Sequence, residues 1–270
     1  MISHLFIYPI KSLGAVSLSN AWLEKEGLRG DRRFMLVDKS GKFITQRTRP
    51  ELTRFSLELS ENGFWVKDLS SGLKKELTWN PILGDWEMVE IWDDSVEVRE
   101  VLEGWSAWFS TALSEEVKLV RITAEKPRVI KPKYQTNLVN NTSFADSLPV
   151  LLVSLGSFHA LEQRLGGAVD PLRFRPNIIV DEMEPFVEDT WEEIQVGTTR
   201  LFGAKPCARC LLVNVNPISG ESDKNTLKTL ASFRTLNQKV YFGQQFVPME
   251  LGEIQVGMSV KVIQSKDAVY

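Results

Sequence analysis

The sequence predicts a mainly β protein with a few helices, of the α+β class. Short runs rich in β-branched and aromatic residues fill most of its first hundred residues, and turn sequences such as KSGK and ENG separate them. Only three segments have the spacing or the boundaries of helices. Short strands joined by tight turns at regular intervals are typical of closed or sandwich-like β architectures.

Composition narrows the functional class. The 270 residues are enough for one large domain or two of ordinary size, and 43% hydrophobic with 25% charged residues indicates a globular chain. A net charge of −3 gives no argument for a nucleic-acid partner. The amino terminus does not resemble a signal peptide, and no apolar run approaches the length of a membrane span. Two cysteines favour a reducing compartment, so we expect a cytoplasmic protein.

The first half of the chain is expected to consist of strands followed by one helix. The helix is predicted at 101–115, where Leu102, Trp105, Phe109 and Leu113 recur at helical spacing. The expected strands are HLFIYPI, SLSNAWL, RRFMLVD, KFITQR, FSLELS, FWVKDL and DSVEVREV.

A basic, proline-containing segment, AEKPRVIKPKYQ at 124–135, follows. Pro127 and Pro132 stiffen it, and lysine and arginine surround them. We interpret it as a connector between two domains, residues 1–125 and 126–270. The alternative is that its basic side chains face an anionic site.

The second half mixes strands with two helices. One helix is expected at 155–165, ended by two glycines, and another near 225–236. The pentapeptide EIQVG occurs at 193–197 and 253–257, which we interpret as one hairpin turn used twice. The expected strands are LPVLLVS, RFRPNIIV, WEEIQVG, TRLFGA, LLVNVN, EIQVG and SVKVIQ.

The two cysteines, Cys207 and Cys210, form a CxxC pair with several explanations. A redox dithiol would begin a helix, and half a zinc site would need ligands beyond the distant His4 and His159. Two buried, inert thiols are a third possibility. Neighbouring Arg209 favours a thiolate, which suits a soft metal whose other ligands arrive with an organic cofactor. Because positions three apart on an extended segment point to opposite faces, we expect only one thiol to line a site.

Arginines and one lysine at strand ends form a second group of candidates. In an extended RFRPN segment, Arg173, Arg175 and Asn177 would share a face and could bind phosphate. The alternative is a solvated strand face with ion pairs to nearby carboxylates. Lys11 of YPIKS and Arg32 of GDRR are further candidate cations.

Eight motifs in order then reveal a family resemblance: YPIKS, GDRRFMLVD, GKFITQR, FADSLPV, RFRPNIIV, EDTW, CARC and FGQQF. Together they closely resemble the MOSC family of molybdenum-cofactor proteins, and within it the amidoxime-reducing components of mitochondria and their bacterial relatives. This resemblance implies a β-barrel-like N-terminal domain followed by a MOSC-type β-barrel domain.

The resemblance also implies a site and a cofactor. The cofactor is Mo-molybdopterin, with Cys210 as the metal ligand and catalytic residue, and Cys207 buried or facing away. Two departures from the family pattern are Leu148, where a serine is common, and Asn216, where an aspartate is expected. The positions that match cofactor-binding residues are Lys11, Ser12, Arg32, Arg175, Asn177 and Cys210.

The function implied is an oxidoreductase that reduces N-hydroxylated compounds such as amidoximes, hydroxylamines and N-hydroxy bases. Electrons would come from a separate ferredoxin-, flavodoxin- or cytochrome b5-like partner, for which the acidic stretch 181–193 offers a docking surface. The alternative is a cofactor carrier or sulfur-handling domain without turnover of its own. Pyridoxal phosphate-like binding is a further property that the resemblance suggests.

Overall fold

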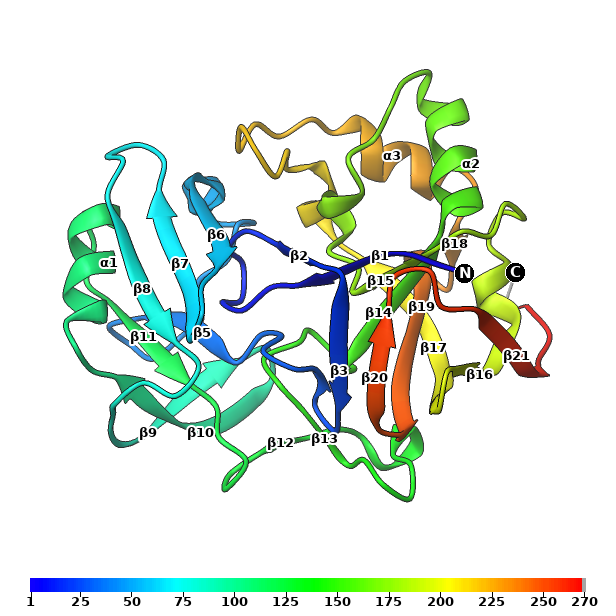
Figure 1. Ribbon diagram of the computed structural model, residues 1–270. Helices are drawn as coiled ribbons and strands as arrows, with labels where there is room; N and C mark the ends of the chain where they lie inside the picture. Colours follow the sequence, from blue (N-terminus) through cyan, green and yellow to red (C-terminus); the bar gives the residue numbers. More distant parts are fainter. Residues whose placement is uncertain (269–270) are drawn as a thin grey trace.

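The computed structural model describes residues 1–268, and over that range it confirms a mainly β fold with three α-helices (Figure 1). Two lobes lie side by side. The first lobe contains 3₁₀-helix η1 (Pro50–Arg54), α1 (Trp105–Leu113), β5 (Phe34–Asp38), β6 (Phe55–Leu59), β7 (Gly63–Asp68), β8 (Lys74–Thr78), β9 (Leu83–Ile91), β10 (Asp94–Val101) and β11 (Val117–Arg121). Between the lobes run β12 (Arg128–Val129), η2 (Pro132–Tyr134) and β13 (Asn141–Thr142).

The second lobe combines the first and the last strands of the chain. Its helical elements are α2 (Leu155–Leu165), η3 (Pro171–Phe174), η4 (Val187–Thr190), η5 (Leu211–Asn214) and α3 (Asn225–Ala231). Its strands are β1 (Ile2–Ile7), β2 (Val16–Leu18), β3 (Asn20–Glu24), β4 (Gly27–Leu28), β14 (Val150–Ser154), β15 (Ile178–Val180), β16 (Trp191–Val196), β17 (Thr199–Arg209), β18 (Thr235–Leu236), β19 (Lys239–Glu250), β20 (Gly252–Gln255) and β21 (Val260–Ser265).

Open sheets build both lobes. The first lobe has one sheet in the order β5-β11-β10-β9 and one in the order β6-β7-β8. The second has a nine-stranded sheet, β2-β1-β15-β14-β19-β17-β16-β21 with β18 paired to β19, and a small sheet, β20-β3-β4. Strand β1 therefore pairs with β15, more than 170 residues further along the chain.

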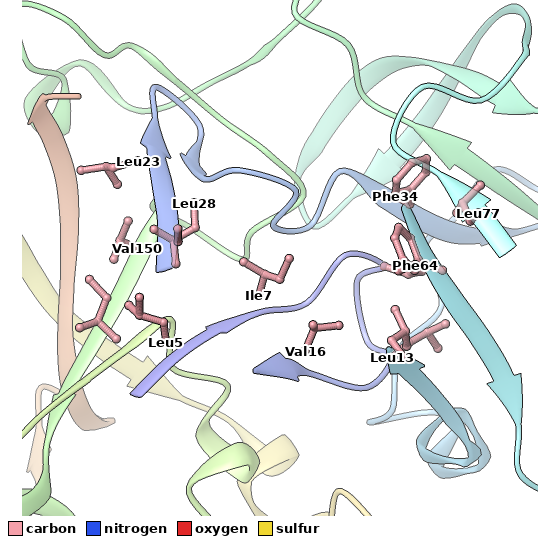
Figure 2. Close-up of a cluster of buried hydrophobic side chains, with 14 of the residues drawn as sticks. Leu5, Ile7, Leu13, Val16, Leu23, Leu28, Phe34, Phe64, Leu77 and Val150 are labelled. Carbon is pink, nitrogen blue, oxygen red and sulfur yellow. The ribbon is translucent and has the colours of Figure 1, made fainter. Parts of the chain in front are cut away.

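A continuous hydrophobic core joins the two lobes. It runs from Leu5 and Val150 in the second lobe through Ile7 and Leu13 to Phe64 in the first, and all of these side chains are buried (Figure 2). Side chains of the β1–β2 segment, which runs between the lobes, therefore pack against both lobes. Burying apolar surface from both lobes in one cluster stabilises their relative arrangement.

The helices agree with expectation in place but not always in length. Helix α2 spans the predicted 155–165, because Ser154 caps its start and Gly166, with φ of 73°, ends it. Helix α1 begins at Trp105, because β10 continues through Val101 before the chain turns. Helix α3 ends at Ala231, because the chain then pairs in the hairpin of β18 with β19.

Four sequence-based expectations are wrong. KFITQR makes only isolated bridges. RFRP forms η3 with a left-handed turn, so strand β15 starts only at Ile178, and LLVN forms η5. The second EIQVG joins β20 and β21, which lie in different sheets, so it is no hairpin. In the first three cases long-range packing or a local turn overrides strand propensity.

Candidate functional site

A cavity of about 450 Å³ brings together every position that the family resemblance matched to a cofactor-binding residue. Residues from the β1–β2 connection, the β9–β10 hairpin, the loop before β14, the turn before β15 and the end of β17 line it. The predicted residues in its lining are Lys11, Ser12, Arg32, Arg175, Asn177 and Cys210.

Strained backbone gathers around this cavity. Ser12, Arg32, Trp92 and Arg175 have φ of 66°, 50°, 56° and 54°, and all four line the cavity. A left-handed conformation costs a non-glycine residue roughly 1–2 kcal/mol. Such strain clusters at functional sites, where the surrounding fold enforces a side-chain direction. At Arg175 the left-handed turn directs the guanidinium toward Tyr8 and Leu13.

Tyr8 lies between two arginines. The guanidinium carbons of Arg32 and Arg175 lie 4.6 and 4.1 Å from the centroid of its ring. Arg32 donates to Asp31 at 2.5 Å and to the carbonyl of Arg175 at 3.1 Å. Burial, and then the charge of Arg32, lower the pKa of Arg175 to about 10. The fold therefore holds two close cations beside one aromatic ring.

Asn177 holds this arrangement in place. Its side-chain oxygen accepts hydrogen bonds from the backbone N–H of Leu151 at 3.1 Å and from Arg32 at 3.3 Å. Its Nδ2 donates to the carbonyl of Phe6 at 3.2 Å. The amide thus links β1, β14 and Arg32, and both acceptor positions of its oxygen are used within the protein.

Lys11 is buried and paired with a carboxylate that the sequence reasoning missed. Its Nζ donates to the carbonyl of Phe144 at 2.8 Å and forms an ion pair with Asp146, whose side chain is 56% exposed. Burial lowers the pKa of Lys11 to about 8, although Asp146 opposes this. Burial disfavours ionised Asp146, but Lys11, Arg32 and Arg47 hold the pKa of its carboxyl well below its usual range.

The two thiols differ in exposure as expected but not in orientation. Cys210 is exposed, and Cys207 is 7% exposed and packed among hydrophobic side chains. The expectation that only one lines the cavity is wrong, because both do. An irregularity in β17 between Pro206 and Ala208 breaks the strict alternation of side chains. Arg209 donates to the sulfur of Cys207 at 3.0 Å, not to that of Cys210.

The arginine N–H donors of the cavity suit an anion, and its exposed thiol suits a soft metal. The Nη2 atom of Arg175 and the Nε atom of Arg209 are buried without hydrogen-bond partners, and a phosphate would satisfy such donors. No three His, Cys, Asp or Glu side chains of residues 1–268 gather into a metal site. A metal held here would therefore rely on the Cys210 thiolate and on ligands that accompany it.

Comparison with known proteins identifies the family. Residues 1–116 match the MOSC N-terminal beta barrel domain, and residues 140–261 match the MOSC domain. The chain is 30% identical to mitochondrial amidoxime-reducing component 1 of Mus musculus, over 97% of this chain and 82% of that protein. The chain belongs to the MOSC-domain family.

Two kinds of relative resemble this MOSC chain over most of its length. Mitochondrial amidoxime-reducing component 1 of Homo sapiens is 30% identical over 97% of the chain and 82% of that protein. Molybdenum cofactor sulfurase of Oryza sativa subsp. japonica is 28% identical over 90% of the chain, which spans 32% of the sulfurase. The helices within residues 1–268 are too short or too polar to cross a membrane.

Three other positions that the sequence singled out in this MOSC protein either lie outside the cavity or form part of its wall. Arg173 points away from the predicted comb and binds Asp223 at 3.2 Å, because η3 replaces the expected strand. Leu148 lines the cavity as a buried apolar residue. Asn216 is not among the lining residues, and its side chain caps its own turn through the N–H groups of Ile218 and Ser219.

Only part of the acidic stretch 181–193 is exposed to solvent. Glu188 is buried and accepts hydrogen bonds from the hydroxyls of Ser154 and Ser157 at 2.7 and 2.8 Å. Asp189 is buried in an ion pair with Arg234. Burial raises the pKa values of both carboxyls. Glu188 anchors η4 to the start of α2, and Asp189 anchors it to Arg234 before β18, so neither carboxylate is available to a docking partner.

Sequence reasoning missed Tyr8, Trp92 and Asp146. Tyr8 stands inside the YPIKS motif and Asp146 inside FADSLPV, so motif order offered a signal for both. No motif pointed to Trp92, because it reaches the cavity only through the β9–β10 turn. There its Nε1 donates to Asp146 at 3.3 Å.

Proposed function

We propose that this chain binds Mo-molybdopterin in the cavity between its lobes and reduces N-hydroxylated compounds. The observation that carries the proposal is the convergence of three cations, two of them buried and Arg175 partly buried, and one exposed thiol, from distant motifs, on a single cavity. Amidoximes, hydroxylamines and N-hydroxy bases are the proposed substrates, consistent with the names of the relatives.

The three cations would hold the anionic part of the cofactor. Lys11, Arg32 and Arg175 carry positive charge in surroundings with little water, where charge-assisted hydrogen bonds to phosphate are strong. Ser12, with its left-handed backbone, would add a hydroxyl donor. Asn177 acts as a positioning residue through its bond to Arg32.

Cys210 would supply the thiolate ligand and act as the catalytic residue. It is exposed where β17 ends and η5 begins, and its neighbour Arg209 is fixed by a hydrogen bond to the carbonyl of Phe174 at 2.8 Å. Leu148, Leu151 and the Phe174 side chain give the cavity an apolar wall that excludes water.

The bound cofactor would supply the two-electron oxygen acceptor that N–O bond reduction needs. In the net reaction an N-hydroxylated compound takes up two electrons and two protons and yields the amine or amidine and water. The electrons would come from a separate carrier of the ferredoxin, flavodoxin or cytochrome b5 type.

Molybdenum analysis and turnover of a model amidoxime test this function. The protein is produced in a host that makes the cofactor, and benzamidoxime reduction is driven by a reduced zwitterionic viologen. We expect near-stoichiometric molybdenum and turnover in the parent. Cys210→Ser should lose turnover because serine is a harder, more basic ligand, whereas the matched Cys207→Ser should keep most of it. Equal losses in both variants would contradict a single-thiolate site.

The similarity to a cofactor sulfurase favours a second candidate, a carrier or sulfur-handling domain. Molybdenum bound without amidoxime turnover would support this candidate and overturn the reductase.

A further inference from the structure

The basic segment after the first lobe is folded against the cavity and is no free linker. Strand β12 pairs with β13. Ile130, Tyr134 and Val139 pack with Leu148 of the cavity wall and with Val247 of β19. Thr136 donates to the carbonyl of Pro248 at 2.9 Å. The side chains that this segment carries are therefore held at fixed places beside the site.

We name four lysines, which belong to the cavity lining or to the segment packed against its wall, the lysine rim: Lys131, Lys133, Lys205 and Lys239. Lys205 and Lys239 line the cavity. The ring of Tyr134 links Lys133 to Lys205, because the Nζ atoms of these two lysines each lie 4.9 Å from its centroid. Burial lowers the pKa of Lys205, and the charges of Lys131 and Lys133 lower it further.

The lysine rim has no compensating carboxylates. Within residues 1–268, none of its four members forms an ion pair at 4.0 Å or less. Lys131, Lys133 and Lys239 are exposed. The whole chain has a net charge of −3, yet the cavity lining holds six Lys or Arg side chains and a single carboxylate, that of Asp146. Unpaired like charges repel one another, so the rim favours an anionic partner.

The composition around Cys210 favours a protein over a small anion. Lys11, Arg32 and Arg175 already provide a site for a small anion inside the cavity, whereas Lys131, Lys133 and Lys239 of the rim are exposed to solvent. Beside them lie exposed Cys210 and Leu211, the latter 65% exposed. An exposed apolar residue beside charged residues resembles the apolar core and polar rim of a protein–protein interface.

We infer that the lysine rim is the docking surface for an acidic one-electron carrier protein, which delivers electrons at Cys210. This inference rests on the proposed function. It differs from the docking surface expected at the acidic stretch 181–193, of which Glu188 and Asp189 are buried. Complementary charges steer such encounters and raise association rates by roughly 10- to 1,000-fold at low salt.

Charge reversal at the rim tests the inference with a matched control. The rim variant is Lys131→Glu with Lys133→Glu, two exposed positions outside the cavity lining. The control is Lys67→Glu with Lys74→Glu, an exposed pair facing each other across β7 and β8 of the first lobe. Both variants change the net charge equally.

Turnover of benzamidoxime is measured with reduced plant-type ferredoxin, flavodoxin and cytochrome b5, and with the zwitterionic viologen. We expect at least one carrier to drive the parent with kcat/KM that falls as salt rises. The rim variant should lose about tenfold or more of that value at low salt, by the steering range above. Viologen-driven turnover should be equal in parent, rim variant and control. Binding of the oxidised carrier should weaken in parallel.

The outcomes that would overturn the docking surface differ from those that would overturn the proposed function. Equal carrier-driven kcat/KM in rim variant and control, or no carrier activity in a parent that the viologen drives, overturns the docking surface and leaves the proposed function standing. A parent without viologen-driven turnover overturns the proposed function and the docking surface with it. Tighter binding of a single-stranded oligonucleotide than of any carrier, lost in the rim variant, would assign the rim to nucleic acid instead.

Discussion

Replacing Arg175 by methionine should remove anion binding while leaving the fold stable. The guanidinium lies 4.1 Å from the ring of Tyr8, donates to the carbonyl of Leu13 at 2.9 Å, and leaves Nη2 buried without a partner. Burial and the neighbouring Arg32 lower its pKa to about 10. The lowered pKa means that keeping the charge in the folded protein at neutral pH costs roughly 3 kcal/mol.

The opposing contributions nearly cancel. Methionine removes the roughly 3 kcal/mol cost of the buried charge. It also loses a charged hydrogen bond of about 1.5–3 kcal/mol and a cation–π contact of about 1–2 kcal/mol. The free energy of unfolding should therefore change by less than about 2 kcal/mol. Arg234 is the control, because it is buried and paired with Asp189, and breaking a buried pair costs about 3–5 kcal/mol.

Urea unfolding at pH 7, with and without pyrophosphate, measures both effects. Pyrophosphate should stabilise the parent and Arg234→Met, but stabilise Arg175→Met much less. Losing one charge-assisted contact of about 1.5–3 kcal/mol corresponds to roughly 10- to 150-fold weaker anion binding. If Arg175→Met lowered the anion-free stability as much as Arg234→Met and kept the full pyrophosphate effect, Arg175 would be a structural cation and the reasoning would be refuted.

Three further predictions concern titratable groups. Folded Lys11 has a pKa of about 8, so between pH 8 and 10 it has lost a proton that the unfolded chain still keeps. The unfolding free energy should therefore rise with pH by up to roughly 3 kcal/mol. A difference in unfolding free energy between parent and Lys11→Met that does not depend on pH would contradict this. Asp146→Asn should strengthen pyrophosphate binding several-fold in calorimetry, because the carboxylate competes for Lys11; weaker binding would show that Asp146 supports the anion site. Glu188→Gln should cost less than about 1.5 kcal/mol in urea unfolding, because burial already favours the uncharged carboxyl, whereas Glu188→Ala should cost more than about 2 kcal/mol by removing the acceptor that two buried serine hydroxyls share; equal costs would contradict the hydrogen-bonding role.

Local sequence signals were reliable where a single element decides its own geometry. Ser154 and Gly166 set the ends of α2, and the strands with tight turns gave the mainly β class. Signals failed where a residue's backbone is set by contacts made far away. Arg175 takes a left-handed conformation at the end of η3, and its guanidinium then bonds to the carbonyl of Leu13, a contact that no alternation pattern contains.

The sequence by itself determined the fold class, the family and the chemical types at the site, because motif order, turn residues and thiol spacing are written along the chain. Tertiary structure alone decided that β1 pairs with β15, that Lys11 is neutralised by Asp146, and that Arg209 contacts Cys207. The tertiary structure also decided that the expected connector at 124–135 packs beside the cavity and carries two lysines of the lysine rim. The physical reason is that burial and charge pairing depend on which distant segments share a space, and hydrophobic packing of both lobes around one core sets that space.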